Sequence, residues 1–257
     1  MSNPVFFAPA GSFGQLSPGS TFVLEGAEAR HAVTVKRLAV GEPVDIADGA
    51  GARLIGTVMD TGSSTLTVQA SEILVEDQPE IRLVLVQALA KGDRDELAIE
   101  TATELGIDAV IPWQSERAIV RWKGDRAVKA HAKWQSVVTA AAKQARRAWI
   151  PEVRSIVDTG ALAKAVAAAD AAIILHEDAK NPLRAVLEET LAVMEGQAGT
   201  SREVLLIVGP EGGIAPREVT RLSDAGAVTA LLGHHVLRSS TAGPAAVVLA
   251  SDVLGRW

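Results

Sequence analysis

The stretch Val204-Leu-Leu-Ile-Val-Gly-Pro-Glu-Gly-Gly213, followed by Pro216, decides the fold. Its five leading apolar residues indicate a strand buried on both faces, the type found in parallel sheets. The glycines after the strand let the backbone approach a ligand, and a helix beginning near Pro216 would present free N–H groups there. The motif is neither the Gly-x-Gly-x-x-Gly of dinucleotide-binding folds nor a P-loop. The alternative is a tight strand-to-helix turn that binds nothing.

Outward from this stretch, apolar strands alternate with helical patterns, which predicts an α/β domain with a parallel sheet covered on both faces. The other buried strands are expected at Ile81–Ala88, Ala109–Pro112, Ala172–Leu175 and Val228–Leu232. Helices are expected at Arg94–Leu105, Arg126–Ala148, Gly160–Ala168, Pro182–Leu191, Pro216–Ala225 and Ala242–Leu254.

The first seventy-odd residues have a different pattern, of short strands separated by glycine turns. Strands are expected at Thr21–Leu24, Pro43–Ala47, Arg53–Met59 and Thr65–Ala70, which suggests a small barrel. The charged, proline-containing segment Val75–Glu80 is the expected boundary. We therefore predict a domain over residues 1–75 and a second over residues 79–257.

Composition narrows the class of protein. The 257 residues are 48% hydrophobic and include no cysteine, which indicates a globular chain without disulfides, thiolate metal sites or a cysteine nucleophile. The five histidines lack metal-ligand spacing, so no metal is expected. The N-terminus does not resemble a signal peptide and no window is long and apolar enough for a membrane span, so a cytoplasmic location is expected.

Positive charge is concentrated in one part of a chain whose net charge is −6. Residues 1–78 hold four basic and nine acidic residues, a balance of −5, whereas residues 114–154 hold ten basic and three acidic residues, a balance of +7. Within that second stretch, residues at spacings of three and four would form one largely basic stripe on the predicted helix. The stripe comprises Arg126, Lys129, Lys133, Ser136, Ala140, Lys143 and Arg147. It predicts either contact with phosphates or a solvated basic helix.

Three loops should meet at the carboxyl ends of the strands, where open α/β sheets bind ligands. They are Leu175–Asp178, Gly209–Gly213 and Leu231–Thr241. In the third loop, Thr241 or Ser240 is expected to cap the last helix, and Arg238 would lie at its positive end, where a negative group could bind. His234 and His235 are expected to be loop residues without a ligand role, although either could act as an acid or base.

The order and spacing of these motifs resemble the RsmE family, the 16S rRNA uridine-N3 methyltransferases of the SPOUT class. The similarity runs nearly from end to end. It rests on His31–Gly41, Asp48-Gly49, Gln87–Glu96, Glu104–Gly106, Pro112–Arg117, Ala141–Arg146, Pro151–Val153, Val208–Gly213, Leu231–Gly233 and Val236–Arg238.

The resemblance implies a PUA-like β-barrel that binds RNA, followed by a SPOUT α/β domain with a trefoil knot, a homodimer and S-adenosylmethionine as methyl donor. It implies that 16S rRNA, within the 30S subunit, is the substrate. The implied cofactor-binding residues are Leu175, His176, Glu177, Val208, Gly209, Pro210, Glu211, Gly212, Gly213, Leu232, Gly233, Val236, Leu237, Arg238, Ser240 and Thr241. The implied RNA-binding residues are His31, Arg37, Lys91, Arg94, Arg126, Lys129, Lys133, Lys143, Arg146 and Arg147.

The sequence departs from the family pattern near Arg238, the residue expected to be catalytic. Ser240 stands where the family commonly has an acidic residue, and His235 where it has arginine. Gly243-Pro244 interrupts an alanine-rich helix start, and proline would be tolerated only in the first helical turn. We expect Arg238 to favour the anion formed when N3 of uracil loses its proton, and no residue is assigned as general base.

Three other hypotheses remain open. One is a SPOUT ribose 2′-O-methyltransferase, although the asparagine motif typical of that group is absent. Another is a non-catalytic RNA-binding assembly factor, which the Ser240 departure supports. The third is a Rossmann dehydrogenase, but this sequence lacks the glycine fingerprint of that fold.

Overall fold

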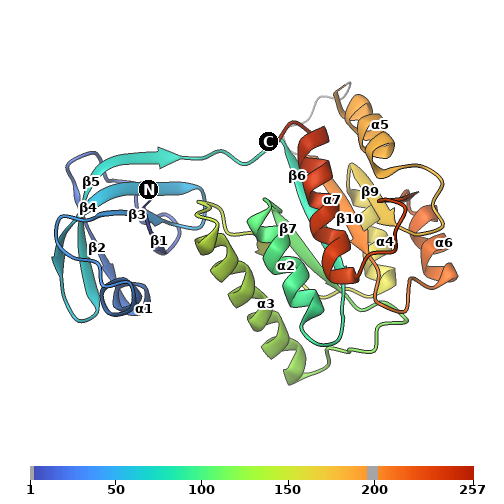
Figure 1. Cartoon of the computed structure of the whole chain (residues 1–257), viewed down its shortest axis with the longest axis horizontal. Helices are drawn as coiled ribbons and strands as arrows, with labels where there is room; N and C mark the ends of the chain where they lie inside the picture. The colour runs from blue at the N-terminus through green and yellow to red at the C-terminus, as the bar shows by residue number, and fades with distance from the viewer. Residues whose placement is uncertain (1–2, 196–201) are drawn as a thin grey trace. The chain divides into compact units, whose positions relative to one another are not determined.

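The structure, a computed structural model, describes residues 3–195 and 202–257. The chain divides into two compact units (Figure 1). The first contains Met1–Gln78 together with Ala142–Ile150, and the second contains Pro79–Ala141 together with Pro151–Trp257. The first division falls within the proline-containing segment Val75–Glu80, whereas sequence patterns do not predict the second stretch of the first unit.

The first unit is built on a five-stranded sheet with the order β1-β3-β4-β5-β2. All its strand pairs are antiparallel except β1 with β3. Register shifts in β4 bend this sheet into a half-barrel around apolar side chains such as Phe6, Leu54 and Leu66. Its elements are β1 (Val5–Phe7), β2 (Thr21–Glu25), α1 (Gly26–Arg30), the π-helical turn η1 (His31–Val35), β3 (Pro43–Ala47), β4 (Ala52–Thr61) and β5 (Thr65–Val75).

The segment Ala142–Ile150 completes the first unit through specific contacts. The N–H of Gly51 donates to the carbonyl of Ala148 at 3.2 Å, and the Trp149 indole donates to the carbonyl of Glu76 at 2.7 Å. At Gly51, a Cβ would lie 2.5 Å from the Trp149 ring, so this close approach requires glycine. The segment therefore packs on the strands as part of the same unit.

The second unit contains a six-stranded sheet with the order β11-β9-β10-β6-β7-β8, and every pairing in it is parallel. The predicted α/β class is therefore confirmed. The predicted edge strand is shorter than expected, because regular pairing ends at Ala230. The strands are β6 (Ile81–Ala88), β7 (Ala109–Trp113), β8 (Glu152–Val153), β9 (Ala171–Leu175), β10 (Arg202–Val208) and β11 (Val228–Ala230).

Successive strand residues point to opposite faces of the sheet, so these apolar strands give it two hydrophobic faces. Helices cover both of them. Val84, Val86 and Ile207 share a core with Leu162 of α4 and Leu222 of α6. The opposite face carries α7, which contacts β6, β10, α2 and α5 (Figure 1). The helices are α2 (Arg94–Glu104), α3 (Asp125–Gln144), α4 (Thr159–Ala168), α5 (Leu183–Glu195), α6 (Pro216–Asp224) and α7 (Ser239–Val253).

The path from β11 to α7 returns the chain from the sheet edge to its centre. Leu231 donates its N–H to Asn181 and accepts the N–H of Leu183, both at 2.8 Å, so the chain here lies against the segment after β9. It then reaches α7, which covers β6 and β10. A C-terminal segment that is threaded through a knot has to return to the middle of the sheet in this way. The trefoil knot itself stays a prediction.

Three predicted helix ends are wrong by three residues or more, and one of them is the end of α5, which is predicted at Leu191 and lies at Glu195. The helix expected to reach Ala148 ends at Gln144, since Arg146 adopts a left-handed conformation with φ 56° and the N–H of Arg147 bonds the carbonyl of Ala142. The last helix begins at Ser239, three residues earlier than expected, so Pro244 lies in its second turn. None of the helices in the described part of the chain has the length and hydropathy that a membrane crossing requires.

Candidate active site

A cavity of about 600 Å³ opens at the carboxyl ends of β9, β10 and β11 in the second unit. The three loops expected to meet at this edge all contribute to its wall. The lining residues are Arg94, Leu175, His176, Glu177, Val208, Gly209, Pro210, Glu211, Gly213, Ile214, Leu231, Leu232, Gly233, His234, His235, Val236, Leu237, Arg238, Ser239 and Ala242.

The loop after β10 is shaped by its glycines. Gly213 has φ 71°, a left-handed conformation, and donates its N–H to the carbonyl of Pro210 at 2.9 Å. At Gly209, a Cβ would lie 2.5 Å from Cγ1 of Ile214, so only glycine fits without moving that cavity side chain. Gly212 does not line the cavity, and its carbonyl accepts a hydrogen bond from Arg117 at 3.1 Å. The loop therefore presents chiefly backbone to a ligand.

The loop after β9 is held by the strand beside it. His176 donates its backbone N–H to the carbonyl of Ala230 at 3.0 Å, and its Nδ1 accepts the N–H of Asp178 at 3.2 Å. These bonds fix the turn in which Leu175, His176 and Glu177 reach the cavity.

The third loop ends at the start of α7, and here the expected helix cap is wrong. Arg238 occupies the N-cap position without a side-chain cap bond, and its carbonyl accepts the N–H groups of Thr241 and Ala242, both at 2.9 Å. Ser240 lies inside the helix, where its side chain is buried, and neither Ser240 nor Thr241 lines the cavity. Helix formation begins before these residues and so removes them from the capping position.

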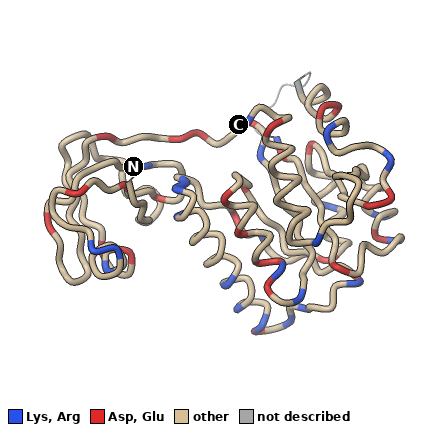
Figure 2. Tube along the Cα trace, viewed as in Figure 1, with Lys and Arg blue, Asp and Glu red and all other residues tan. Residues whose placement is uncertain are grey.

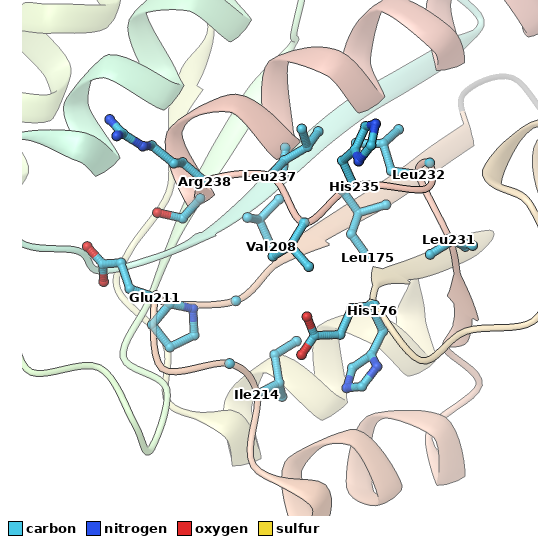
Figure 3. A pocket seen from close by; sticks show the side chains of 18 of the residues that line it. Leu175, His176, Val208, Glu211, Ile214, Leu231, Leu232, His235, Leu237 and Arg238 are labelled. Carbon is cyan, nitrogen blue, oxygen red and sulfur yellow. The ribbon is translucent and has the colours of Figure 1, made fainter.

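Charged side chains of the cavity wall come from several elements: Glu177 follows β9, Glu211 follows β10, and Arg238 precedes α7. Figure 3 shows Arg238 and Glu211 on one side of the view and His176 on the other, with the apolar side chains of Val208, Leu237 and Ile214 between them. Glu211 accepts a hydrogen bond from Arg94 at 3.1 Å, whereas Arg238 has no ion-pair partner among the described residues. The cavity thus combines an apolar interior with one paired and one unpaired guanidinium, a composition that suits a ligand with both apolar and polar parts.

The first three basic residues of the stripe on α3 are exposed, but not all of its positive charge is free. Lys and Arg recur along the helix (Figure 2), and Arg126, Lys129 and Lys133 are exposed. On the adjoining row of the helix, Trp134 is buried and packs edge-on against Trp122, with ring centroids 5.3 Å apart. Lys133, however, pairs with Glu96 at 2.7 Å and with Asp93 at 3.5 Å.

The hydrogen bond to Glu96 is the main reason that the pKa of Lys133 is raised, which keeps the side chain protonated. Its charge is thereby compensated within the protein. The spacing of the stripe does not reveal this pairing, because Glu96 is distant in sequence.

In the first unit, the expected RNA-binding residues differ in how exposed they are. Arg37 and Arg146 are exposed, and both have positive φ. His31 is half-buried, and its ring lies edge-on to Phe6 with centroids 6.0 Å apart. Lys143 pairs with Glu28 at 2.5 Å, so that charge is also compensated internally.

The remaining residues of the RNA-binding prediction also have defined positions. Lys91 is exposed in the loop between β6 and α2, and Arg94, at the start of α2, lines the cavity. Arg147 is half-buried.

Six residues of the cavity wall have no ligand role in the predictions made from the sequence, and one of them, Ala242, lies in the first turn of α7. Ile214 extends the predicted loop Gly209–Gly213 by one residue, whereas Leu231 is the first residue of the predicted loop Leu231–Thr241. His234 and His235 belong to the predicted loop and were set aside for lack of a chemical signal. Ser239 follows Arg238 directly and was passed over because the helix was expected to begin later.

Residues 77–251 match the RNA methyltransferase domain family, the class of protein that this parallel sheet and its strand-tip cavity define. The ribosomal RNA small subunit methyltransferase E of Mycobacterium bovis is 40% identical over 245 residues, covering 93% of this chain and 89% of that protein. The Bacillus subtilis protein of the same name is 27% identical over 229 residues, covering 89% and 88%. The chain belongs to the ribosomal RNA small subunit methyltransferase E family.

A solved structure agrees with this membership. The crystal structure of the Neisseria gonorrhoeae ribosomal RNA small subunit methyltransferase E, bound to S-adenosyl methionine, superposes with a TM-score of 0.79. The two chains are 25% identical, and the match covers 98% of each.

Proposed function

We propose that this protein transfers a methyl group from S-adenosylmethionine to N3 of a uridine in 16S rRNA. The observation that carries the proposal is the single cavity formed by the loops after β9, β10 and β11. Membership in the ribosomal RNA small subunit methyltransferase E family supports both the reaction and the RNA.

The cavity fits S-adenosylmethionine in size and chemistry. Its volume of about 600 Å³ is in the usual range for small-molecule sites, roughly 300–1,000 Å³. Apolar side chains such as Leu175, Val208 and Ile214 can take the adenine ring. The glycine-bearing loop Gly209–Gly213 offers backbone groups for its polar edge, and Arg238 and Arg94 can meet a carboxylate or the RNA. Three other residues implied by the resemblance lie outside the wall, namely Gly212, Ser240 and Thr241.

When bound, S-adenosylmethionine supplies an electrophilic methyl group on a sulfonium. The protein must align uracil N3 with that methyl group and favour loss of the N3 proton. Arg238, unpaired in the cavity wall, provides positive potential for the resulting anion. Because N3 is occupied in a base pair, the target base must be exposed or flipped before it enters. No side chain is assigned as general base.

The wider assembly forms the second part of the proposal. Residues 1–75 act as a PUA-like RNA-binding domain and residues 79–257 as a SPOUT knot domain that works as a homodimer. The substrate is 16S rRNA in the 30S subunit, in the cytoplasm. Exposed cations support RNA contact, in particular Lys91, Arg126 and Lys129. Lys133 and Lys143 contribute less, since both are paired with carboxylates.

The test is methyl transfer from labelled S-adenosylmethionine to 30S subunits that lack the modification, followed by nucleoside mass spectrometry and mapping. The proposal predicts N3-methyluridine at one position of 16S rRNA. A 2′-O-methylated nucleoside would instead assign the protein to the ribose methyltransferases. Failure to bind S-adenosylmethionine, together with retained binding to the subunit, would indicate a non-catalytic assembly factor.

A further inference from the structure

The loop after β10 contains one peptide unit that is held by a hydrogen bond on each side. This unit joins Gly212 to Gly213. Its N–H, from Gly213, donates to the carbonyl of Pro210 at 2.9 Å, and its carbonyl, from Gly212, accepts from Nη1 of Arg117 at 3.1 Å. A peptide unit between two glycines rotates more freely than any other, because neither residue has a Cβ. The two hydrogen bonds therefore fix an orientation that the loop's own residues leave open.

The two bonds come from different parts of the chain. Pro210 and Gly213 both line the cavity and close a turn within the loop itself. Arg117 is 95 residues away from Gly212 in the sequence, follows β7, and is not part of the cavity wall. A Cβ on Gly212 would lie 3.6 Å from Cβ of Arg117, so this side chain packs along the outside of the turn. Arg117 can therefore shape the wall without touching a ligand.

The backbone that carries Arg117 is itself held in place. The N–H of Glu116 donates to Oε1 of the buried Glu218 at 2.9 Å. Arg121 donates to the carbonyls of Ser115 and Glu116, at 2.9 Å and 2.7 Å. Ser115 is fully buried. The guanidinium of Arg117 thus reaches the loop from an ordered support.

We infer that Arg117 is a positioning residue for the methyl-donor site, which locks the peptide between Gly212 and Gly213 in the orientation that S-adenosylmethionine binds. This inference rests on the proposed function and adds to it a residue outside the cavity. Without the guanidinium, the turn samples other peptide orientations, and the apparent affinity falls by the fraction of molecules that keeps the binding orientation. Once the cofactor is bound, the orientation is restored, so the chemical step changes little.

The test compares Arg117→Ala, Arg117→Lys and Lys123→Ala with the wild-type protein. Lys123 is the matched control, because it is an exposed cation of the same segment and does not line the cavity. The measurements are the dissociation constant for S-adenosylmethionine by calorimetry, its KM and the kcat at saturating cofactor with unmodified 30S subunits, and thermal unfolding.

We expect Arg117→Ala to bind S-adenosylmethionine about 5-fold to 20-fold more weakly, with an equal rise in KM and a kcat within about 2-fold of wild type. Arg117→Lys keeps a cationic N–H donor for the carbonyl, so its affinity should recover to within about 3-fold. Lys123→Ala should bind the cofactor like the wild type.

A second substitution separates locking of the turn from a loss of charge or of overall stability. Gly212 does not have a left-handed φ, so alanine is compatible with the turn and excludes the left-handed alternatives that glycine allows. Gly212→Ala added to Arg117→Ala should therefore recover about 3-fold in affinity. A purely structural role for Arg117 would lower the unfolding temperature and kcat, and Gly212→Ala would then recover no affinity.

Other outcomes overturn the inference. If Arg117→Ala binds S-adenosylmethionine as tightly as the wild type, the inference is wrong and the proposed function stands. If Lys123→Ala loses as much affinity, the effect is one of net charge and the inference is also wrong. If the wild type does not bind the cofactor, the proposed function fails and the inference fails with it. If the wild type binds the cofactor but makes a different methylated nucleoside, only the proposed target fails, and the affinity series decides the role of Arg117.

Discussion

The two edges of the central sheet carry similar polar residues but arrange them differently. At the amino edge, charged groups compensate one another: Glu203 of β10 accepts hydrogen bonds from Arg82 and Arg154, and Arg256 pairs with Asp108 at 2.6 Å. At the carboxyl edge, Gln87, Ser115 and Ser239 keep buried polar atoms without partners in the described residues, whereas toward the amino edge the Ser251 hydroxyl is the one such atom among these residues. The cavity also lies at the carboxyl edge.

This difference separates stability from function. Paired charges at the amino edge hold strand ends together and leave little capacity for a ligand. The carboxyl edge keeps unsatisfied groups and glycine turns, which cost stability and suit binding. Substitutions at the amino edge should therefore alter unfolding, and those at the carboxyl edge should alter chemistry.

Arg238→Ala should have the largest effect on turnover. Removing the unpaired guanidinium from the cavity wall should lower kcat by about 100-fold, while affinity for S-adenosylmethionine changes little, because the charge acts mainly on the uracil anion. Single-turnover methylation and calorimetry measure the two quantities. Arg217→Ala is the matched control, since Arg217 is exposed, pairs with Glu116 and lies outside this cavity. Equal turnover in the two variants contradicts the role of Arg238.

Two glycines of the same loop should respond differently to alanine. Gly209→Ala places a Cβ 2.5 Å from Ile214, a cavity side chain, whereas Gly212→Ala makes only ordinary contacts with Arg117 at 3.6 Å. Overpacking of about 1–2 kcal/mol corresponds to roughly 5-fold to 30-fold weaker binding. Calorimetry should show that loss for Gly209→Ala and less than about a 3-fold change for Gly212→Ala. Equal losses of affinity in the two variants would mean that both glycines contact the methyl donor.

At the amino edge, Glu203→Gln should affect stability alone. The hydrogen bond from Arg154 is the main reason that the pKa of Glu203 lies below its ordinary value of 4.5. The folded state therefore gains stability above that pH and loses it as the pH falls through the lowered pKa. Urea unfolding should show a loss of about 1–2 kcal/mol at pH 7 that shrinks below pH 4. Methyl transfer at neutral pH should stay at the wild-type rate; a large drop in kcat would break the proposed separation of the two edges.

The smallest effects should come from the basic face of α3. Lys129 is exposed and has no ion-pair partner among the described residues, whereas Lys133 is paired with Glu96. In filter binding to 30S subunits over a salt series, Lys129→Ala should weaken binding about 3-fold and reduce the salt slope by roughly one. Lys133→Ala should change the affinity and the salt slope less, because the charge of Lys133 is already compensated by Glu96. The reverse order would show that the ion pair opens when RNA binds.

Local patterns predict most of the sheet and the three loops, because buried parallel strands are apolar throughout and glycine turns follow them. The cavity follows from the rule that such loops meet at one sheet edge. Local patterns do not predict contacts between residues that are far apart in the sequence. The pairing of Lys133 with Glu96 depends on how α2 lies beside α3, which no local spacing records.

The start of α7 could not be predicted for a related reason. Sequence alone favoured a cap at Ser240 or Thr241, since hydroxyl residues usually occupy that position. In the structure Arg238 takes the N-cap position and the helix begins at Ser239, which leaves Pro244 in the second turn. Gly243 packs against Leu85, where a Cβ would lie 3.0 Å from Cδ1. The Gly243-Pro244 pair therefore occurs where α7 packs tightly on β6, and the capping residues do not explain it.

A crystal structure with S-adenosylmethionine is the most direct test of the claim that three strand-tip loops form one methyl-donor site. The predicted result is density for the cofactor in contact with Gly209–Gly213 and Leu231–Arg238 together, with Leu175–Glu177 completing the wall. Cofactor bound elsewhere, or a cavity without density at saturating concentration, would contradict the account.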